Sequence, residues 1–300
     1  MMKAIDRLIK RINDTNSVLC VGLDPNDIFF THKIKQIEGI IEQYREFCYK
    51  VIDSVHDIVP CIKLNIAFFE PLGPEGLALF KELLEYSSSI GLVTVSDIKR
   101  GDIGSSSEAY AKAYLSNGAP FESDFITVNG YLGIDGVEPF ASLADKNEKG
   151  LFILVKTSNK SSSEIQDLKT LGENKAVYEK MGELVEKWGE NCIGENGYSS
   201  IGAVVGATHK EELQKMREKH PKMFFLVPGF GVQGGSADDI KCAFDQNGLG
   251  AIINSSRGII GKPFSIEKNE KRYLSDEEFK QMIIEEVRAN NEKLNSVRRK

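Results

Sequence analysis

Three charged residues with the spacing Asp-x-Lys-x-x-Asp lie in one short run of this 300-residue chain. Asp97, Lys99 and Asp102 follow the apolar residues 92–95, where a buried strand would end. Positions 97 and 99 of a strand point to the same face, because side chains alternate with a period of two. Since buried charges cost desolvation energy unless they are paired, a cluster of this kind indicates a catalytic site.

A lysine earlier in the chain extends this cluster. Lys63 and Asn65 also lie two positions apart, in the apolar run 61–66. The four charges alternate in sign, and an opposite pair at about 4 Å attracts by roughly 4 kcal/mol at an effective dielectric near 20. That attraction would hold Lys99 protonated and aimed, as a group that can stabilise and then protonate a carbanion. The alternative is an ion-pair network that only fixes the strand ends.

Two glycine-containing segments predict a phosphate site. Residues 228–235 read Pro-Gly-Phe-Gly-Val-Gln-Gly-Gly, and residues 254–258 read Asn-Ser-Ser-Arg-Gly. A glycine-rich loop lets backbone N–H groups approach an anion, to which Arg257 and Gln233 would add side-chain donors. The alternative is a tight turn beside a surface arginine. Phosphate is favoured because both segments follow the expected seventh and eighth strands, where barrels often bind it.

The elements that must position these residues alternate along the chain as short apolar runs and longer amphipathic segments. This pattern predicts an α/β protein, a single (β/α)8 barrel domain over residues 1–300. An open doubly wound sheet is disfavoured, because no Gly-x-Gly-x-x-Gly motif follows the first strand. We expect strands at residues 18–23, 61–66, 92–96, 125–128, 151–155, 203–205, 224–227 and 251–254.

Helices are expected between these strands and at both ends of the chain. An amphipathic N-terminal helix would be additional to the barrel, and the polar residues 159–175 and 194–200 look like loop insertions. The last helix should begin at Ser275, which precedes an acidic first turn. The predicted helices cover residues 37–54, 75–89, 105–117, 135–145, 173–192, 210–219, 237–246 and 275–295.

The composition narrows the class of protein. The chain has 38 Lys and Arg against 44 Asp and Glu, and this net charge of −6 disfavours a general nucleic-acid binder. Five scattered cysteines without a Cys-x-x-Cys pair disfavour a zinc site or a disulfide framework, and none of the four histidines lies at a strand end. Because the N-terminus lacks a signal-peptide core and no apolar stretch has membrane-span length, we expect a cytoplasmic protein without membrane partners.

Together, these motifs resemble the orotidine 5′-monophosphate decarboxylase family over nearly the whole chain. The resemblance rests on Leu23-Asp24-Pro25, Lys63-Leu64-Asn65, residues 97–103, the glycine-rich loop 228–235 and Ser256-Arg257. It implies a homodimer that converts orotidine 5′-monophosphate to UMP and CO2, the last step of de novo UMP biosynthesis. It also implies that the reaction needs no cofactor and no metal.

The resemblance further assigns roles to individual residues. Lys63, Asp97, Lys99 and Asp102 would form a charged tetrad in which Lys99 protonates C6 of the pyrimidine after CO2 leaves. Asp102 and Ile103 would reach into the partner subunit's site, with Ser106 near the partner's ligand. The other implied substrate-binding residues are Asp24, Lys63 and Asn65 for the ribose, Thr157 or Ser158 for the pyrimidine, and Pro228, Gln233, Gly234, Ser256 and Arg257 around the phosphate.

Two other functions fit parts of this pattern. A magnesium-dependent sugar-phosphate lyase on the same barrel also uses Asp-x-Lys-x-x-Asp, with an enediolate intermediate. A non-catalytic nucleotide-binding barrel would keep the phosphate loops but would have a broken tetrad. The complete set of motifs favours the decarboxylase.

Overall fold

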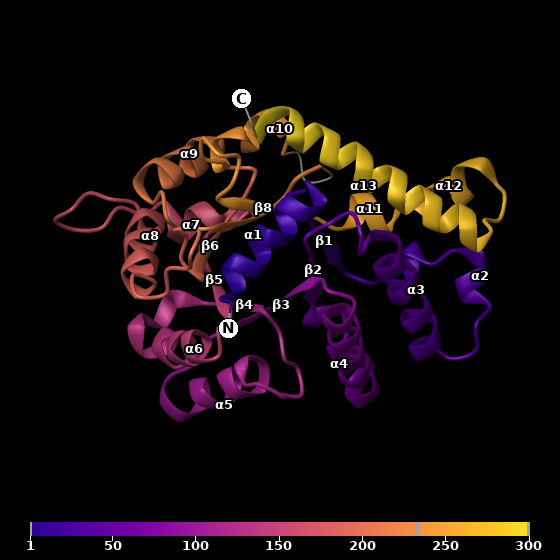
Figure 1. The fold of residues 1–300 in the computed structure, drawn as a ribbon, viewed down its shortest axis with the longest axis horizontal. Helices are drawn as coiled ribbons and strands as arrows, with labels where there is room; N and C mark the ends of the chain where they lie inside the picture. Colours follow the sequence, from indigo (N-terminus) through magenta and orange to yellow (C-terminus); the bar gives the residue numbers. More distant parts are fainter. Residues whose placement is uncertain (1, 232–234, 299–300) are drawn as a thin grey trace.

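Eight parallel strands close into one barrel in the order of the sequence, in a computed structural model that describes residues 2–231 and 235–298 (Figure 1). The predicted (β/α)8 barrel is confirmed, and the strand bounds lie within two residues of the predicted ones except at the end of β3. The strands are β1 (Leu19–Leu23), β2 (Cys61–Asn65), β3 (Val93–Arg100), β4 (Phe125–Val128), β5 (Gly150–Lys156), β6 (Ile201–Val205), β7 (Phe225–Pro228) and β8 (Ala251–Ser255).

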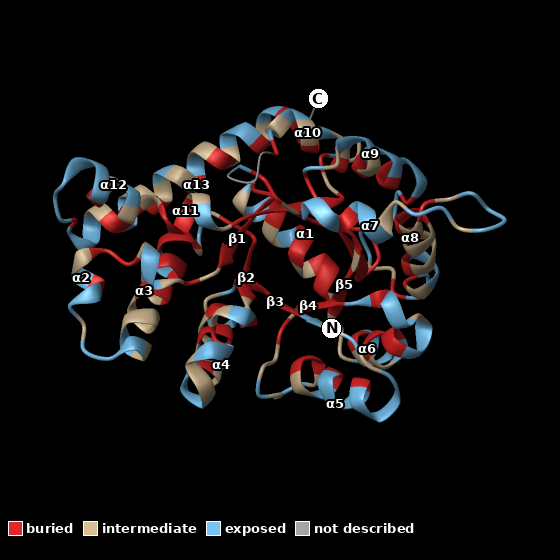
Figure 2. Cartoon of the chain, turned by 180° about the vertical axis from the view of Figure 1, so that it is seen from behind, coloured by how far each residue is buried: buried red, intermediate tan, exposed pale blue. Residues whose placement is uncertain are grey.

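Helices surround the barrel, with their outward faces exposed and the strands buried (Figure 2). Continuous apolar runs form these strands because each strand is covered on both faces. Among the described residues, no helix is long and apolar enough to cross a membrane. The helices are α1 (Ala4–Thr15), α2 (His32–Lys35), α3 (Ile40–Val55), α4 (Gly73–Ser89), α5 (Gly104–Leu115), α6 (Ile134–Lys146), α7 (Ser163–Gln166), α8 (Val177–Trp188), α9 (Lys210–Lys219), α10 (Ala237–Ile240), α11 (Arg257–Ile260), α12 (Lys262–Glu270) and α13 (Asp276–Arg298).

Local sequence signals predict the start of the last helix correctly but not the extent of α10. The Ser275 hydroxyl accepts the backbone N–H of Glu278 at 3.2 Å, and the Glu278 carboxylate accepts the backbone N–H of Ser275 at 2.8 Å. This reciprocal cap starts α13 where the sequence predicts it. By contrast, the predicted helix over residues 237–246 is wrong in extent: α10 ends at Ile240, and a 3-10 turn covers Lys241–Ala243.

The third strand continues past its apolar segment to Arg100. The backbone N–H groups of Ile98 and Lys99 both donate to Thr127 Oγ1, each at 2.9 Å. The register between β3 and β4 shifts between Ser96 and Arg100, so a side-chain hydroxyl replaces a backbone acceptor there. The prediction of a strand end at residue 96 is therefore wrong, because the strand's last part is held by a neighbouring strand and not by its own apolar residues.

The N-terminal helix α1 packs across the end of the barrel where the strands begin. Arg7 forms an ion pair with Asp124, just before β4, at 2.6 Å, and the backbone N–H of Ala4 donates to Glu148, just before β5, at 2.8 Å. Asp6, 3% exposed, accepts hydrogen bonds from the backbone N–H groups of Glu195 and Asn196, both at 3.0 Å. The predicted extra helix thus fastens the inserted loop 194–200, and the opposite end of the barrel stays open.

We expect Asp6→Ala to lower the free energy of unfolding by about 2 kcal/mol, because two backbone N–H groups of the inserted loop lose their buried acceptor. Urea unfolding at pH 7 measures this change. Asp14→Ala, in the same helix but exposed and paired only with Lys10, is the control and should change it by less than about 0.5 kcal/mol. Equal effects of the two substitutions would contradict the role of Asp6.

Candidate active site

Two adjoining cavities open at the carboxyl ends of the strands. A polar cavity of about 410 Å³ is bounded by the ends of β1, β2, β7 and β8, and a more apolar one of about 390 Å³ by the ends of β3 to β8. Leu154, Val204 and Leu226 line only the apolar cavity. The two cavities form one cleft, because they share Lys63, Asp97, Pro228 and Asn254.

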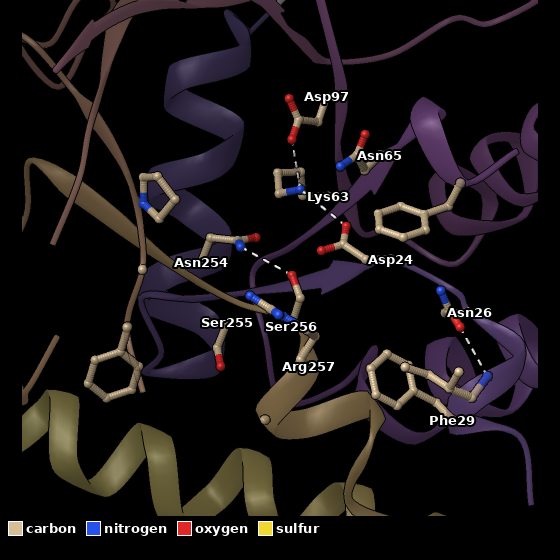
Figure 3. Close-up of a pocket in the computed structure, with 16 residues that line it drawn as sticks. Asp24, Asn26, Phe29, Lys63, Asn65, Asp97, Asn254, Ser255, Ser256 and Arg257 are labelled. Carbon is tan, nitrogen blue, oxygen red and sulfur yellow. Dashed lines mark hydrogen bonds and ion pairs between the residues drawn. The ribbon is translucent and has the colours of Figure 1, made fainter. Parts of the chain in front are cut away.

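The charged residues of the cleft meet where its two halves join. Lys63 Nζ lies 3.0 Å from Asp97 Oδ2 and 3.6 Å from Asp24 Oδ1, and Lys99 Nζ lies 2.5 Å from Asp97 Oδ1. Figure 3 shows the Lys63 ammonium group between the carboxylates of Asp97 and Asp24. The structure thus brings Asp97, Lys99 and Lys63 together at one place in the cleft.

The ion pairs determine the charge states of these groups. Burial would raise the pKa of the Asp97 carboxyl group, but the charges and hydrogen bonds of Lys63 and Lys99 outweigh burial and hold that pKa well below its ordinary value. Burial likewise favours neutral Lys63, yet the charges of Asp24 and Asp97 raise the pKa of its ammonium group above the ordinary value. Both groups are therefore ionised at neutral pH.

The backbone at Lys99 has an unusual conformation that turns its side chain onto Asp97. Its φ is +46°, in the left-handed region that side chains other than glycine rarely adopt. Thr127 holds this conformation, because its Oγ1 accepts the N–H groups of Ile98 and Lys99 and donates to Asp97 Oδ1 at 2.9 Å. Thr127 is a site residue that the sequence analysis missed, since a threonine in an apolar run is typical of any strand.

Two buried acceptors in the polar half have no hydrogen-bond donor among the described residues. They are Asn254 Oδ1 and Asp24 Oδ1, and the latter faces the Lys63 ammonium group at 3.6 Å, beyond hydrogen-bond distance. A Cβ at Gly22 would lie 1.9 Å from the Ser256 hydroxyl, so only glycine lets the end of β8 lie this close to β1. Buried acceptors without donors are costly, which makes these oxygens suited to a ligand's hydroxyl groups. Asn254 is a polar residue at the end of the predicted eighth strand, but the sequence pattern alone does not assign it a role in ligand binding.

Comparisons with known proteins agree with this geometry. A sequence profile of the "Orotidine 5'-phosphate decarboxylase / HUMPS family" matches residues 17–272. The chain belongs to this family. It is 42% identical to an orotidine 5′-phosphate decarboxylase of Rhodopirellula baltica over 92% of this chain and 93% of that protein. Another from Clostridium acetobutylicum is 44% identical over 85% of this chain and 88% of that protein.

Solved structures of the family share the fold. The structure of the Leishmania donovani OMP decarboxylase has a TM-score of 0.77 and 30% identity, and the match covers 99% of both chains. The family resemblance seen in the sequence motifs is thereby confirmed. The residues matched by the family profile, 17–272, include all eight strands of the barrel.

Not all of the predicted site residues lie at the charged cluster. Asn65 and Pro228 line the polar half, with Ser256 and Arg257, and the exposed Arg257 guanidinium group has no ion pair with a described residue. Gln233 and Gly234 lie outside the described residues. Asp102 forms no ion pair with a described residue, and the family resemblance implies that it reaches into the partner subunit's site.

The loop after β3 explains the position of Asp102. Its carboxylate accepts the backbone N–H of Ile103 at 2.8 Å, and both Ile103 and Ser106 are exposed. None of these three residues lines either cavity of their own chain's cleft. The alternating tetrad is incomplete within one chain.

The two candidates for the pyrimidine contact follow the end of β5. Thr157 and Ser158 both line the apolar half. The Thr157 hydroxyl accepts from Gln166 Nε2 at 2.8 Å and donates to Asn159 Oδ1 at 2.6 Å. The Thr157 hydroxyl group is therefore engaged within its own chain, and Ser158 is the other residue that the family resemblance assigns to the pyrimidine.

We expect Asp97→Asn to lower the free energy of unfolding by about 3 kcal/mol at pH 7, because Lys63 loses its closest counter-charge while it stays buried. The folded-state pKa of Asp97 lies below its unfolded value of about 4. The contribution of the ionised carboxylate is therefore complete above that pH and is lost as the pH falls below it.

Urea unfolding at several pH values tests this expectation. The stability difference between wild type and Asp97→Asn should shrink from pH 7 toward pH 3. Asp135→Asn, at an exposed position of α6, is the control and should change stability by less than about 0.5 kcal/mol throughout. A difference for Asp97→Asn that stays constant with pH would contradict the assignment.

Proposed function

We propose that this chain decarboxylates orotidine 5′-monophosphate to UMP and CO2. The observation that carries the proposal is the position of the charged cluster at the junction between a polar and an apolar half-cleft. A nucleotide with its ribose phosphate in the polar half and its base in the apolar half would present the carbon next to the glycosidic bond to that junction. Relatives at 42% and 44% identity named as this decarboxylase support the assignment.

Lys99 is the proposed proton donor. Its side chain is half exposed to the cleft, whereas the Lys63 side chain is almost completely buried between two carboxylates. The electron pair left at C6 when CO2 departs is not delocalised into the ring, so stabilisation must come from a fixed cation nearby. Lys99, held by Asp97 at 2.5 Å, supplies that cation and then transfers its proton to C6.

The ribose phosphate would occupy the polar half of the cleft. Asp24 Oδ1 and Asn254 Oδ1 are suited to accept hydrogen bonds from ribose hydroxyl groups, with Lys63 and Asn65 beside them. Arg257 is free to pair with the phosphate, together with Ser256 and the predicted contacts from Gln233, Gly234 and Pro228. Binding energy from this remote group can be used to close the site around the reacting carbon.

A homodimer would complete the site. Exposed apolar side chains gather beyond the ends of β3 and β4, at Ile103, Tyr110, Tyr131, Leu132 and Ile134. A patch of this kind on the rim that carries Asp102 fits an interface with a second copy, which buries it and brings Asp102 and Ile103 to the partner's cleft. We also propose that residues 1–300 form one barrel domain and that the protein is cytoplasmic.

The magnesium-dependent lyase remains the alternative reaction on this barrel. Asp97 is a poor candidate for a metal ligand, because both its oxygens already accept hydrogen bonds from Lys63, Lys99 and Thr127. Within residues 2–231 and 235–298, no group of three or more histidine, cysteine or acidic side chains is arranged to hold a metal ion.

Following orotidine 5′-monophosphate by ultraviolet absorbance in excess EDTA tests the proposed function. Rapid conversion to UMP supports a metal-independent decarboxylase. Activity on sugar phosphates that appears only with magnesium would support the lyase. Tight UMP binding without turnover would identify a nucleotide-binding barrel.

We expect Lys99→Ala to lower kcat by at least about a thousandfold, because both the cation and the proton donor are lost. UMP binding, measured by calorimetry, should persist, since the phosphate and ribose contacts remain. Lys81→Ala, on the exposed face of α4, is the matched control and should keep wild-type kcat. Residual activity of Lys99→Ala near that of wild type would refute the role.

Subunit complementation tests the shared site. If Lys99 and the partner's Asp102 serve one site, a hybrid dimer of Lys99→Ala and Asp102→Ala has one intact site and one doubly substituted site. Random mixing should then restore about a quarter of the wild-type activity. Mixing Lys99→Ala with Asp97→Ala is the control and should restore none, because these two residues act within one chain. The absence of recovery in the first mixture would place Asp102 in its own chain's site.

A further inference from the structure

The inserted segment 159–175 is bonded to the end of β5, which carries the residues of the apolar half-cleft. Lys156, the last residue of β5, is completely buried, and its Nζ lies 2.6 Å from Asp167 Oδ1. The same ammonium group lies 5.6 Å from the centre of the Tyr178 ring. Because an ammonium group is stable at such depth only beside a counter-charge, Asp167 fixes the insertion to this strand end.

The next residue along the chain is held at its backbone as well as at its side chain. Gln166 Oε1 accepts the backbone N–H of Thr157 at 2.9 Å, and Gln166 Nε2 donates to the Thr157 hydroxyl at 2.8 Å. The Thr157 carbonyl oxygen is 3.1 Å from the Nε2 atom of His209. Both polar atoms of the Gln166 amide group therefore form hydrogen bonds with Thr157.

Ser158 follows this fixed residue and packs against the end of β6. A Cβ at Gly206 would lie 2.9 Å from Ser158 Cα and 3.0 Å from Ser158 N, so the backbone of Ser158 fits only against a glycine. The backbone N–H of Gly206 donates to the Lys156 carbonyl oxygen at 2.7 Å. Ser158 is thus confined from one side by Gly206 and from the other by the residues that hold Thr157.

We propose that Gln166 and Asp167 are positioning residues that set Ser158 against the pyrimidine ring. The insertion would then be part of base recognition and not a solvated loop. This inference rests on the proposed function, because it takes the base to lie in the apolar half of the cleft.

The chemistry of the ring makes such positioning useful. The leucine and valine side chains that line this half contact the faces of a pyrimidine but cannot pair with its carbonyl oxygens or its N–H group. Those edges lose their hydrogen bonds to water on binding and need a partner at the correct distance and angle. A serine whose backbone is held on both sides offers that partner without a further ordering cost.

Comparing ligands with and without the base tests the proposal. We expect Gln166→Ala to raise the Kd of UMP, measured by calorimetry, by about tenfold, which corresponds to one lost or misplaced hydrogen bond. The inhibition constant of ribose 5-phosphate in the decarboxylation assay should stay within about twofold of wild type, because that ligand lacks the base. Glu164→Ala, at an exposed position of the same helix α7, is the control and should change neither constant.

A second pair of variants checks the buried ion pair. Asp167→Asn should weaken UMP binding in the same selective way, and Asp167→Glu, which keeps the charge opposite Lys156, should restore it in large part. Equal losses for UMP and ribose 5-phosphate would overturn the proposal, because they would indicate a general loss of structure. Unchanged UMP binding in Gln166→Ala would also overturn it.

Measurements on the wild-type protein distinguish a failure of the proposed function from a failure of the positioning role. Wild type that neither binds UMP nor converts orotidine 5′-monophosphate refutes the proposed function, and the inference with it. Wild type that does both, beside a Gln166→Ala variant with wild-type constants, refutes the positioning role alone.

Discussion

The Asp97 carboxylate is shared by two ammonium groups and one hydroxyl group, and the open end of the barrel is built around it. A carboxylate buried this deeply stays ionised only where cations and hydrogen-bond donors replace water. Lys63 of β2, Lys99 of β3 and Thr127 of β4 provide them. One ionised group therefore ties together three adjacent strands, and it also sets the direction in which the Lys99 ammonium group points.

Polar residues at the two ends of the barrel have different partners. At the strand starts, α1 closes the barrel through Asp6 and Arg7, whose partners are other parts of the same chain. At the strand ends, the polar atoms of Asp24 and Asn254 are left for a ligand. The contacts at the strand starts hold parts of the chain together, whereas these two oxygens at the strand ends can meet a ligand, which allows the site to vary without disturbing the core.

Features of the fold and the site that depend on the local pattern of apolar and charged residues can be predicted from the sequence. Continuous apolar runs identify all eight strands, and charges at the strand ends identify Lys63, Asp97 and Lys99 as one cluster. The sequence predicts poorly what depends on contacts between strands. The extension of β3 needs the Thr127 hydroxyl of another strand, and nothing local marks that threonine. The hydrogen bonds between Gln166 and Thr157 join a polar insertion to a strand end. No local sequence pattern marks such a pair, because the two residues meet only in the folded chain.

The left-handed backbone at Lys99 has a consequence for when the work of orientation is done. A residue with φ of +46° is held in a sparsely populated conformation, at a cost that the surrounding fold must offset. The chain meets that cost when it folds, so the backbone of the proposed proton donor is already oriented before a substrate binds. A substrate would then meet charges and dipoles that are already oriented. In water, by contrast, the solvent dipoles must reorient during the reaction, which costs free energy.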